Sequence, residues 1–203
     1  MLPILNGYHK SGYGIRNIYK KYVFLIVFIF LLYISMVCSC MIPVPNFPTN
    51  CEWGPILWKL LQGMADKYGK LITPLFSKEE ETSWPNLINL TLKILPCKEC
   101  REHYKEFLSK HNPSIIKTLP TDQQSLWVQN FFWNLHNQVN IRNNKDIIDF
   151  SQLHNIYKNV NFRYELKHYE KLLTIVFRYN EVSLFSWRDW LKNFKTLESI
   201  YGL

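Results

Sequence analysis

The chain has 203 residues, of which 47% are hydrophobic and 20% charged, a composition that indicates a folded domain with a sizeable core and excludes a disordered chain. The formal net charge of +8 would suit a nucleic-acid partner, but the basic residues are spread along the chain without a DNA- or RNA-binding motif, so none is expected. Glycine is scarce, at 7 residues, which argues against phosphate-cradling loops and tight-turned β architectures.

The first predicted element is a membrane anchor. From Tyr22 to Ile42 about 20 residues run without a charge, which at helical rise is enough to cross a bilayer. Basic residues precede this segment and no charge follows it before Glu52, so the positive-inside rule places residues 1–21 in the cytoplasm. A cleaved signal peptide is the alternative, because small residues lie between Ser35 and Cys40. Either outcome exposes the rest of the chain to a disulfide-permissive compartment.

A proline-rich segment at 43–50 is predicted to form a short, stiff linker. Beyond it, apolar residues recur at helical spacing and no sustained period-two alternation occurs, so the predicted fold class is all-α. Helices are expected over residues 52–68, 83–95, 97–112, 122–142, 163–177 and 186–200.

Local signals mark the ends of several predicted helices. If the second helix starts at residue 83, Pro85 lies in its first turn, where proline is tolerated. Thr121 and Gln124 form a capping-box pattern at the start of the fourth helix. The last helix is expected to start at Ser186, with Asp189 as its capping partner.

Cys97 and Cys100 form a Cys-x-x-Cys at the predicted start of the third helix. Two cysteines at this spacing lie about one turn apart, close enough for a disulfide, and the helix dipole favours the thiolate. A redox-active pair is therefore the leading interpretation. A structural disulfide, half of a zinc site and buried thiols are the alternatives, although no second Cys-x-x-Cys or His-x-x-x-His follows to complete a zinc site, so no metal is expected.

The sequence around this pair contains further blocks in a recognisable order. They are WGPILWKLL at Trp53–Leu61, LPCKECREHY at Leu95–Tyr104, FFWNLHNQVN at Phe131–Asn140, and then Lys145 and Tyr157. In order and spacing, over residues 51–157, they resemble the Erv/ALR family of FAD-linked sulfhydryl oxidases. The Trp-Gly-Pro-x-x-Trp start is similar to the branch of this family found in large DNA viruses.

The resemblance implies a bundle of four helices plus a short fifth helix over residues 51–158, with FAD at its mouth, and leaves 159–203 as a helical C-terminal extension. The aromatic helices of this extension either cover the bundle, extend a dimer interface or bind a partner. Cys97 is implied to be the sulfur attacked by the substrate thiolate, and Cys100 the sulfur that faces the flavin.

The resemblance also implies which residues line the cofactor: Gly54, Trp58, Gln62, His103, His136, Asn137, Val139, Asn140 and Lys145. Aromatic and imidazole rings can stack on adenine, asparagine can hydrogen-bond ring edges, and lysine can neutralise phosphate. The chain departs from the family pattern at three positions. Pro55 stands in place of arginine, Gln62 in place of a cofactor-contacting histidine, and Phe131 in place of tryptophan.

Three cysteines remain outside the pair. Family members commonly relay electrons from bulky clients through a second, mobile cysteine pair, and the candidates here are Cys38, Cys40 and Cys51. A cysteine in or beside a membrane helix is otherwise apolar filling or a lipidation site. Alternatively, Cys51 bridges two protomers, because the family tends to form homodimers.

The sequence therefore predicts a single-pass membrane protein that acts as an FAD-dependent thiol oxidase. It is expected to make disulfides in client protein dithiols or in a thioredoxin-like carrier and to reduce O2 to H2O2. Its catalytic domain is expected in an extracytoplasmic, ER-like compartment or at a virion membrane. The rival hypotheses are a flavin-free thiol–disulfide exchange protein and a membrane-tethered interaction module in which Cys97 and Cys100 are structural.

Overall fold

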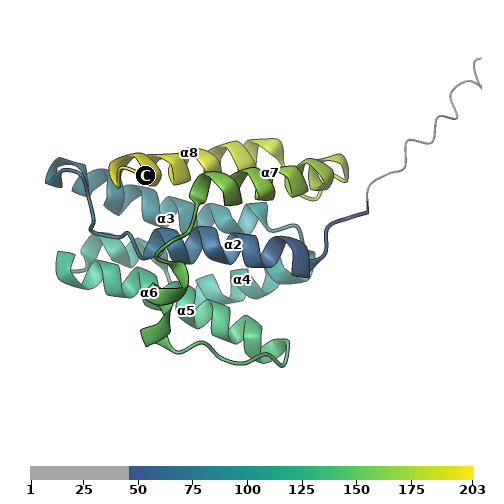
Figure 1. Ribbon diagram of the computed structural model, residues 1–203, viewed down its shortest axis with the longest axis horizontal. Helices are drawn as coiled ribbons and strands as arrows, with labels where there is room; N and C mark the ends of the chain where they lie inside the picture. The colour runs from purple at the N-terminus through teal and green to yellow at the C-terminus, as the bar shows by residue number, and fades with distance from the viewer. Residues whose placement is uncertain (1–45) are drawn as a thin grey trace, which may run out of the picture. The chain divides into compact units, whose positions relative to one another are not determined.

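Every regular element in the part of the chain that the computed structural model describes, residues 46–203, is a helix (Figure 1). The predicted anchor at 22–42 and the tail before it lie outside the described residues, as do Cys38 and Cys40. Among the described helices, none is both long and apolar enough to cross a membrane. In chain order the α-helices are α2 (Asn50–Ala65), α3 (Ser77–Ile94), α4 (Lys98–Lys110), α5 (Thr121–Arg142), α6 (Leu153–Tyr157), α7 (Phe162–Arg178) and α8 (Leu184–Ile200). Short 3-10 helices cover Pro74–Phe76, Pro113–Thr118 and Phe150–Gln152.

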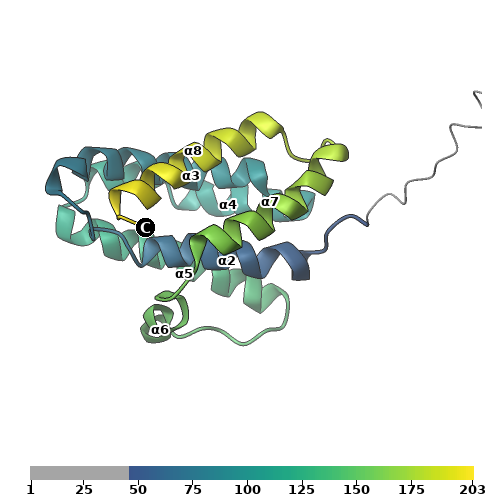
Figure 2. The same ribbon diagram turned by 45° about the horizontal axis from the view of Figure 1, so that its top comes forward.

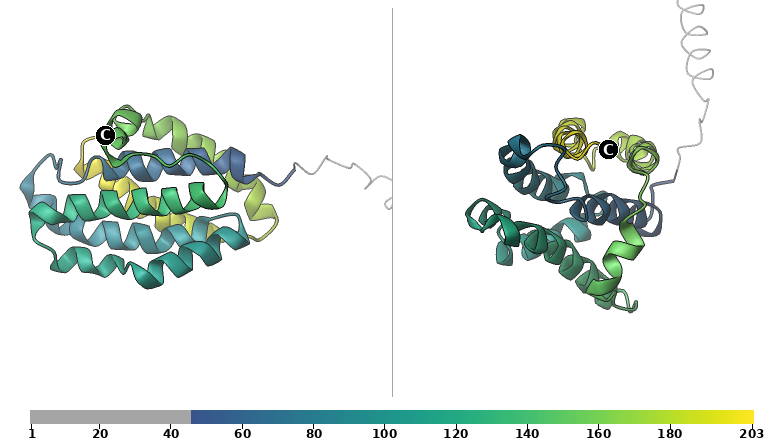
Figure 3. Two further views of the ribbon diagram at one scale, coloured as in Figure 1. Left: turned by 90° about the horizontal axis from the view of Figure 1, so that it is seen from below. Right: turned by 60° about the vertical axis from the view of Figure 1, so that its left-hand side comes forward.

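The inner part of this unit is a bundle of α2, α3, α4 and α5, which Figure 3 shows from below and from one end. The apolar faces of the helices meet in one core, in which Leu60, Trp84 and Phe132 are wholly buried. The short α6 packs against the end of α2, where His154 Nδ1 lies 2.6 Å from the Asp66 carboxylate. The predicted all-α class is confirmed, and these five helices match the expected bundle with a short fifth helix.

α7 and α8 form an outer layer, in which α7 lies along α2 and α8 lies along α3 (Figure 2). Both helices bury large side chains in the shared core, and Tyr169, Trp190 and Phe194 have no exposed surface. The Trp190 indole N–H donates to Thr91 Oγ1 at 2.9 Å, and the Tyr169 hydroxyl donates to the Ile94 carbonyl oxygen at 3.1 Å. Of the three roles that the sequence left open for residues after 160, the structure therefore supports covering the bundle.

A glycine lets this outer layer come close to α2. A Cβ added at Gly63 would lie 3.0 Å from the side chain of Val160 and 3.2 Å from the ring of Phe162, which is tighter than ordinary packing. An alanine at position 63 would therefore require the side chains of Val160 and Phe162 to shift by a few tenths of an ångström.

Tyr201, which follows α8, is tied to α3 of the inner bundle through a buried carboxylate. Glu80 of α3 accepts hydrogen bonds from the Gly69 N–H at 2.7 Å and from the Tyr201 hydroxyl, which in turn accepts one from the Trp84 indole N–H at 2.8 Å. Burial raises the pKa of Glu80 despite these two donors. Gly69 has a φ of 79°, a conformation that suits glycine and lets its N–H point at the carboxylate.

The start of α3 differs from the prediction. The helix begins at Ser77, so Pro85 lies inside it rather than in its first turn. A proline in a helix interior removes one backbone hydrogen bond, and here the loss occurs beside the wholly buried Trp84, where packing against the core holds the helix together. Glu79 and Glu80 in the first turn favour the helix dipole and mark the observed start.

The predicted capping box of α5 is wrong. Pro120 occupies the N-cap position and Thr121 is the first helical residue. The Gln124 side chain turns inward instead, where it accepts a hydrogen bond from the Tyr68 hydroxyl at 2.9 Å and donates one to the Leu119 carbonyl oxygen at 3.1 Å. The Gln124 side chain, which the local pattern assigned to capping, therefore bonds instead to a buried tyrosine in the turn after α2.

The predicted start of the last helix is also wrong. Its N-cap is Ser183, whose hydroxyl oxygen accepts a hydrogen bond from the Phe185 N–H at 3.2 Å. Ser186 and Asp189 both lie within α8, so the expected pairing between them does not cap it.

Candidate active site

Cys97 and Cys100 are joined in a disulfide at the start of α4, with their Cα atoms 5.1 Å apart. Cys97 is the N-cap residue, and its Sγ accepts a hydrogen bond from the Cys100 N–H at 3.1 Å. A sulfur at a helix N-terminus is favoured as a thiolate, because the free N–H groups and the helix dipole stabilise negative charge. Both cysteines are partly exposed and pack against the core, so the pair is accessible and held in place.

Two neighbours that the sequence did not identify hold this pair. The Asn50 side chain, at the start of α2, donates from Nδ2 to Cys97 Sγ over 3.8 Å. Arg101 fastens the segment before the pair, because its Nη1 donates to the Leu95 carbonyl oxygen at 2.8 Å and to the Pro96 carbonyl oxygen at 3.2 Å.

A line of residues on α2 leads away from the disulfide. Asn50, Gly54, Trp58 and Gln62 follow one another at intervals of four, so they form one slowly turning stripe along the helix. The stripe spans roughly 18 Å at 1.5 Å per residue. At Gly54 a Cβ would meet no atom within 4 Å, so the surface of α2 is open there.

At the far part of this stripe, Trp58 of α2 stacks on His136 of α5. The two ring centroids are 4.1 Å apart and the planes are tilted by 11°. Gln62 Nε2 lies 2.9 Å from His136 Nδ1 and 3.4 Å from the Phe132 carbonyl oxygen. A carbonyl oxygen can only accept, so the Gln62 amide nitrogen faces both groups, His136 Nδ1 accepts, and the ring proton lies on Nε2.

His136 is therefore neutral near neutral pH. Its burial, and secondly the charge of Lys145, lower its pKa to about 4. A neutral imidazole can stack on a flat ring without bringing a charge into the site.

Asn137 and Asn140 turn their amide groups toward the segment that follows α5. Asn137 donates to the Ile148 carbonyl oxygen at 2.9 Å and accepts from the Ile148 N–H at 2.9 Å. Asn140 Nδ2 donates to the Asp146 carbonyl oxygen at 3.1 Å, and the main-chain carbonyl oxygen of Asn140 accepts from the Lys145 N–H at 2.9 Å. The two asparagines thus hold the loop that carries Lys145 close to His136.

The remaining predicted cofactor residues lie at the edges of this cluster. Val139 is partly buried on α5, and its carbonyl oxygen accepts from the Asn143 side chain at 2.8 Å. His103, on α4 after Cys100, has a half-exposed ring whose Nε2 lies 3.9 Å from the Glu99 carboxylate. The predicted cofactor residues of α2 and α5 therefore contact one another through the Trp58–His136 stack. His103 does not take part in this contact and lies beside the disulfide instead.

The residues present fit the dinucleotide that the resemblance implies. Two buried polar atoms of α2 have no hydrogen-bond partner within the described residues, namely Trp53 Nε1 and Gln62 Oε1. Unpaired buried polar atoms are costly and point to a missing partner. The Gln62 oxygen, the open surface at Gly54 and the flat stack at Trp58 and His136 lie along one side of α2, which is therefore suited to aromatic and hydrogen-bonding groups.

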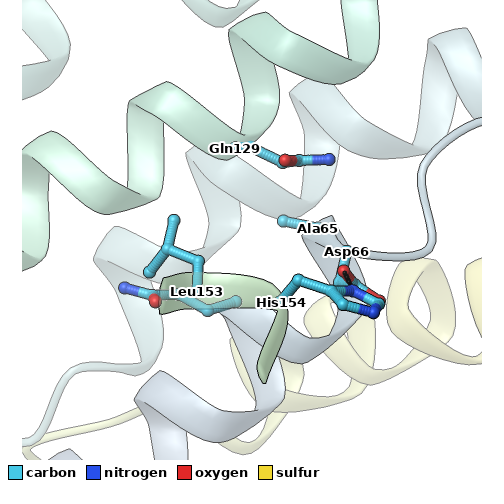
Figure 4. Close-up of a pocket in the computed structure, with 6 residues that line it drawn as sticks. Ala65, Asp66, Gln129, Leu153 and His154 are labelled. Carbon is cyan, nitrogen blue, oxygen red and sulfur yellow. Dashed lines mark hydrogen bonds and ion pairs between the residues drawn. The ribbon is translucent and has the colours of Figure 1, made fainter. Parts of the chain in front are cut away.

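A small polar pocket lies at the opposite end of α2 from the disulfide (Figure 4). Its volume of about 20 Å³ has room for one water molecule. It is lined by Gln62 and Ala65 of α2, Asp66 after α2, Gln129 of α5, and Leu153 and His154 of α6. Burial opposes ionisation of Asp66, but hydrogen bonds from His154 and two lysines outweigh it and lower the pKa of the carboxyl. The pocket is too small for a flavin ring and serves to join α6 to α2.

Two further observations bear on the alternatives that the sequence raised for its cysteines. Within residues 46–203 no three or more histidine, cysteine or acidic side chains gather as they would around a metal ion. Cys51, the second residue of α2 and next to Asn50, is exposed and has no disulfide partner among residues 46–203. It therefore lies on the same end of the bundle as the redox disulfide.

Comparison with known proteins agrees with this site. Residues 55–159 match the model of the Erv1 / Alr family. An FAD-linked sulfhydryl oxidase of African swine fever virus, from a Tick/Malawi isolate, is 35% identical over 108 residues, which is 53% of this chain and 81% of the relative. The same protein from a Pig/Kenya isolate is 34% identical over the same shares of both chains. No solved structure was found to match.

Proposed function

Since the chain belongs to the Erv1/Alr family, we infer that it is an FAD-linked sulfhydryl oxidase whose redox centre is the Cys97–Cys100 disulfide. The observation that carries this conclusion is the stripe of α2, which runs from Asn50 beside Cys97 to Gln62 beside His136. It connects an accessible disulfide to the stacked rings of Trp58 and His136 and to the unpaired Gln62 carbonyl oxygen along one helix. The substrates are dithiols, and oxygen is the electron acceptor.

We propose that Cys97 is the sulfur attacked by the client. A client thiolate would attack Cys97 Sγ, form a client–Cys97 mixed disulfide and release Cys100 as a thiolate. A second client thiolate would then attack the client sulfur of that mixed disulfide, form the client disulfide and release Cys97 as a thiolate. The Asn50 amide and the Cys100 N–H, both directed at Cys97 Sγ, would stabilise the thiolate that leaves in this second step.

When bound, FAD accepts the two electrons of the reduced cysteine pair and passes them, with the two thiol protons, to oxygen to give hydrogen peroxide. We propose that Trp58 and neutral His136 stack on its flat groups, that the Gln62 carbonyl oxygen accepts a hydrogen bond from it, and that Lys145 pairs with phosphate. Asn137 and Asn140 would act by holding the Lys145 loop, while Gly54 would leave room for the ring, and His103 and Val139 would line the edges.

The membrane assignment remains a proposal drawn from the sequence. We propose that residues 22–42 anchor the protein with the N-terminus in the cytoplasm, and that the oxidase domain lies in an ER-like compartment or at a virion membrane. Cys38, Cys40 and Cys51 are proposed to relay electrons from protein clients. A homodimer, if it forms as in the family, would use surfaces other than the faces of α2 and α3 that α7 and α8 cover.

Flavin content tests the function and separates it from both rivals. The purified full-length chain should be yellow, with the absorption of bound flavin. Cys100→Ser should keep the flavin but lose oxygen consumption with dithiothreitol. A folded, colourless protein would support flavin-free exchange or a structural role instead, and undiminished turnover of Cys100→Ser would show that the chemistry lies elsewhere.

The relay proposal needs a comparison between two kinds of substrate. Replacing Cys38 and Cys40 together by serine, or Cys51 alone, should slow oxidation of a reduced protein more than oxidation of dithiothreitol. Equal slowing of both substrates, or of neither, would count against a relay.

A further inference from the structure

Two segments that are far apart in the sequence meet beside the redox disulfide. One is the linker before α2, and the other is the turn between α7 and α8, which lies at the end of the unit where α2 begins (Figure 1). Arg101 joins the turn to the redox segment: its Nη1 donates to the carbonyl oxygens of both Pro96 and Glu181 at 3.2 Å, and its Nη2 pairs with the Glu181 carboxylate at 2.8 Å. The turn is thus two hydrogen bonds away from the residue that precedes Cys97.

The linker reaches the same place from the other side. Asn50 contacts Cys97 Sγ, and Phe47 precedes Asn50 by three residues. The Phe47 ring packs edge-on against Tyr179 of the turn, with ring centroids 5.4 Å apart and an interplanar angle of 78°. The linker and the turn therefore contact each other through Phe47 and Tyr179, and each is also joined to the redox segment, the linker through Asn50 and the turn through Arg101.

Large side chains of the linker, of the turn and of the start of α8 are exposed. Phe47 is 37% exposed and Tyr179 is 44% exposed, and the first two residues of α8, Leu184 and Phe185, are 45% and 76% exposed. We call these four residues the apolar rim. None of them lies within residues 55–159, the part that matches the family, so the rim is contributed by segments that flank the family domain.

We propose that the apolar rim binds the segment of a client polypeptide that flanks its reactive cysteine, and that it favours clients with aromatic or aliphatic residues there. This inference rests on the proposed function, because a client sulfur must bond to Cys97 Sγ and its neighbouring residues must then lie against whatever surrounds Cys97. Incompletely folded chains expose such apolar residues. Small dithiols carry no flanking residues and would gain nothing from the rim.

The test measures formation of the peptide–Cys97 mixed disulfide, here by attack of the Cys97 thiolate on an activated peptide cysteine, without flavin chemistry. The full-length chain with Cys97 as its sole cysteine, the others being replaced by serine, is mixed with two peptides whose cysteine is activated as a 2-nitro-5-thiobenzoate disulfide. One peptide has leucine, tryptophan and phenylalanine around the cysteine, and the other has serine and glycine. The Cys97 thiolate forms a mixed disulfide with the peptide and releases the coloured thiobenzoate, whose appearance gives the rate; the same protein with Cys97→Ser supplies the background.

The apolar peptide should react about 3- to 10-fold faster than the polar one, the range expected for one or two aromatic contacts. Tyr179→Ala and, separately, Phe47→Ala should bring this ratio close to one, whereas Tyr179→Phe should keep it. Tyr164→Ala is the matched control, since Tyr164 is an exposed tyrosine in the first turn of the same helix α7, and it should also keep the ratio.

A ratio near one in the parent protein, or a ratio that survives both alanine substitutions, would overturn the inference. Neither result would touch the oxidase assignment, which depends on bound flavin and on oxygen consumption with dithiothreitol. Conversely, a colourless protein that still showed the rim-dependent ratio would refute the oxidase assignment and support the rim as a binding surface.

Discussion

Replacing His136 by phenylalanine should change how the stability of the protein depends on pH. In the folded protein the ring stacks on Trp58 and accepts a hydrogen bond from Gln62, and burial followed by the charge of Lys145 lowers its pKa from 6.5 to about 4. Phenylalanine keeps a flat ring against Trp58 but cannot bind a proton. The substitution therefore isolates the contribution of this one titrating group.

The sign follows from proton binding in the two states. Between pH 4 and pH 6.5 the unfolded histidine is protonated and the folded one is not, so stability rises with pH in this window and is lost as the pH falls from 6.5 toward 4. The full difference in pKa corresponds to about 3 kcal/mol. Because the ring is only partly buried, solvent screening reduces this, and we expect a loss of about 1.5 kcal/mol.

The assay is urea unfolding of the flavin-free protein, followed by tryptophan fluorescence, across the range from about pH 4 to about pH 7.5. The quantity of interest is the unfolding free energy of His136→Phe minus that of the wild type. This difference should be constant above pH 6.5 and should rise by about 1.5 kcal/mol as the pH falls toward 4. His168→Phe, the same substitution at an exposed position of α7, serves as the control and should not show this rise.

A difference that stays flat down to pH 4 would refute the reasoning. It would mean that the imidazole takes up its proton in the folded state as readily as in the unfolded one, and so that burial and the charge of Lys145 do not disfavour the charged ring.

Three further predictions concern the redox pair, the buried carboxylate and the outer layer. With Cys97 as the sole cysteine, Asn50→Ala should slow alkylation of Cys97 by iodoacetamide at neutral pH about threefold, because a donor to the sulfur is lost. The control Asn155→Ala should leave the rate unchanged. Equal rates for Asn50→Ala and the parent protein would show that the Asn50 contact is unimportant. Burial raises the pKa of Glu80, so the wild type should lose stability as the pH rises from about 4.5 through that raised pKa, whereas Glu80→Gln should not. Urea unfolding measures this dependence. Unfolding free energies that change with pH in the same way for both proteins would contradict the prediction. Trp190→Ala should lower the unfolding free energy by about 3–5 kcal/mol, because a wholly buried indole and its hydrogen bond to Thr91 are lost. A loss under about 1 kcal/mol would mean that α8 is not part of the core.

Much of the helical content could be predicted from the sequence, because helix formation depends on residues three and four apart. The apolar spacing predicted each of the long helices, and the Cys-x-x-Cys was correctly expected at the start of one. The errors concern helix ends. Gln124 was assigned to a cap but bonds to Tyr68 of another segment, and Pro85 was assigned to a first turn but lies inside a helix whose packing tolerates it.

The candidate site was predicted only in part. Trp58, Gln62 and His136 were identified by resemblance, and the structure brings these three into contact. Asn137 and Asn140 were expected to line the cofactor, which stays a prediction; in the structure their amide groups bond to the backbone of the loop that carries Lys145. Asn50 was not identified at all, because its only signal is a contact with a sulfur that lies 47 positions away in the chain.

The amino-acid sequence by itself determined the all-helical class, the redox pair at a helix start and the family to which the chain belongs. These are properties of short-range spacing and of residue identity, which a linear pattern records. Only the tertiary structure decided that α7 and α8 complete the core, that Asn50 and Arg101 hold the redox segment, and that Phe47 and Tyr179 meet beside it. Such contacts join residues that are distant in the chain, and their energy exists only once the helices have packed, so no local pattern of residues reports them.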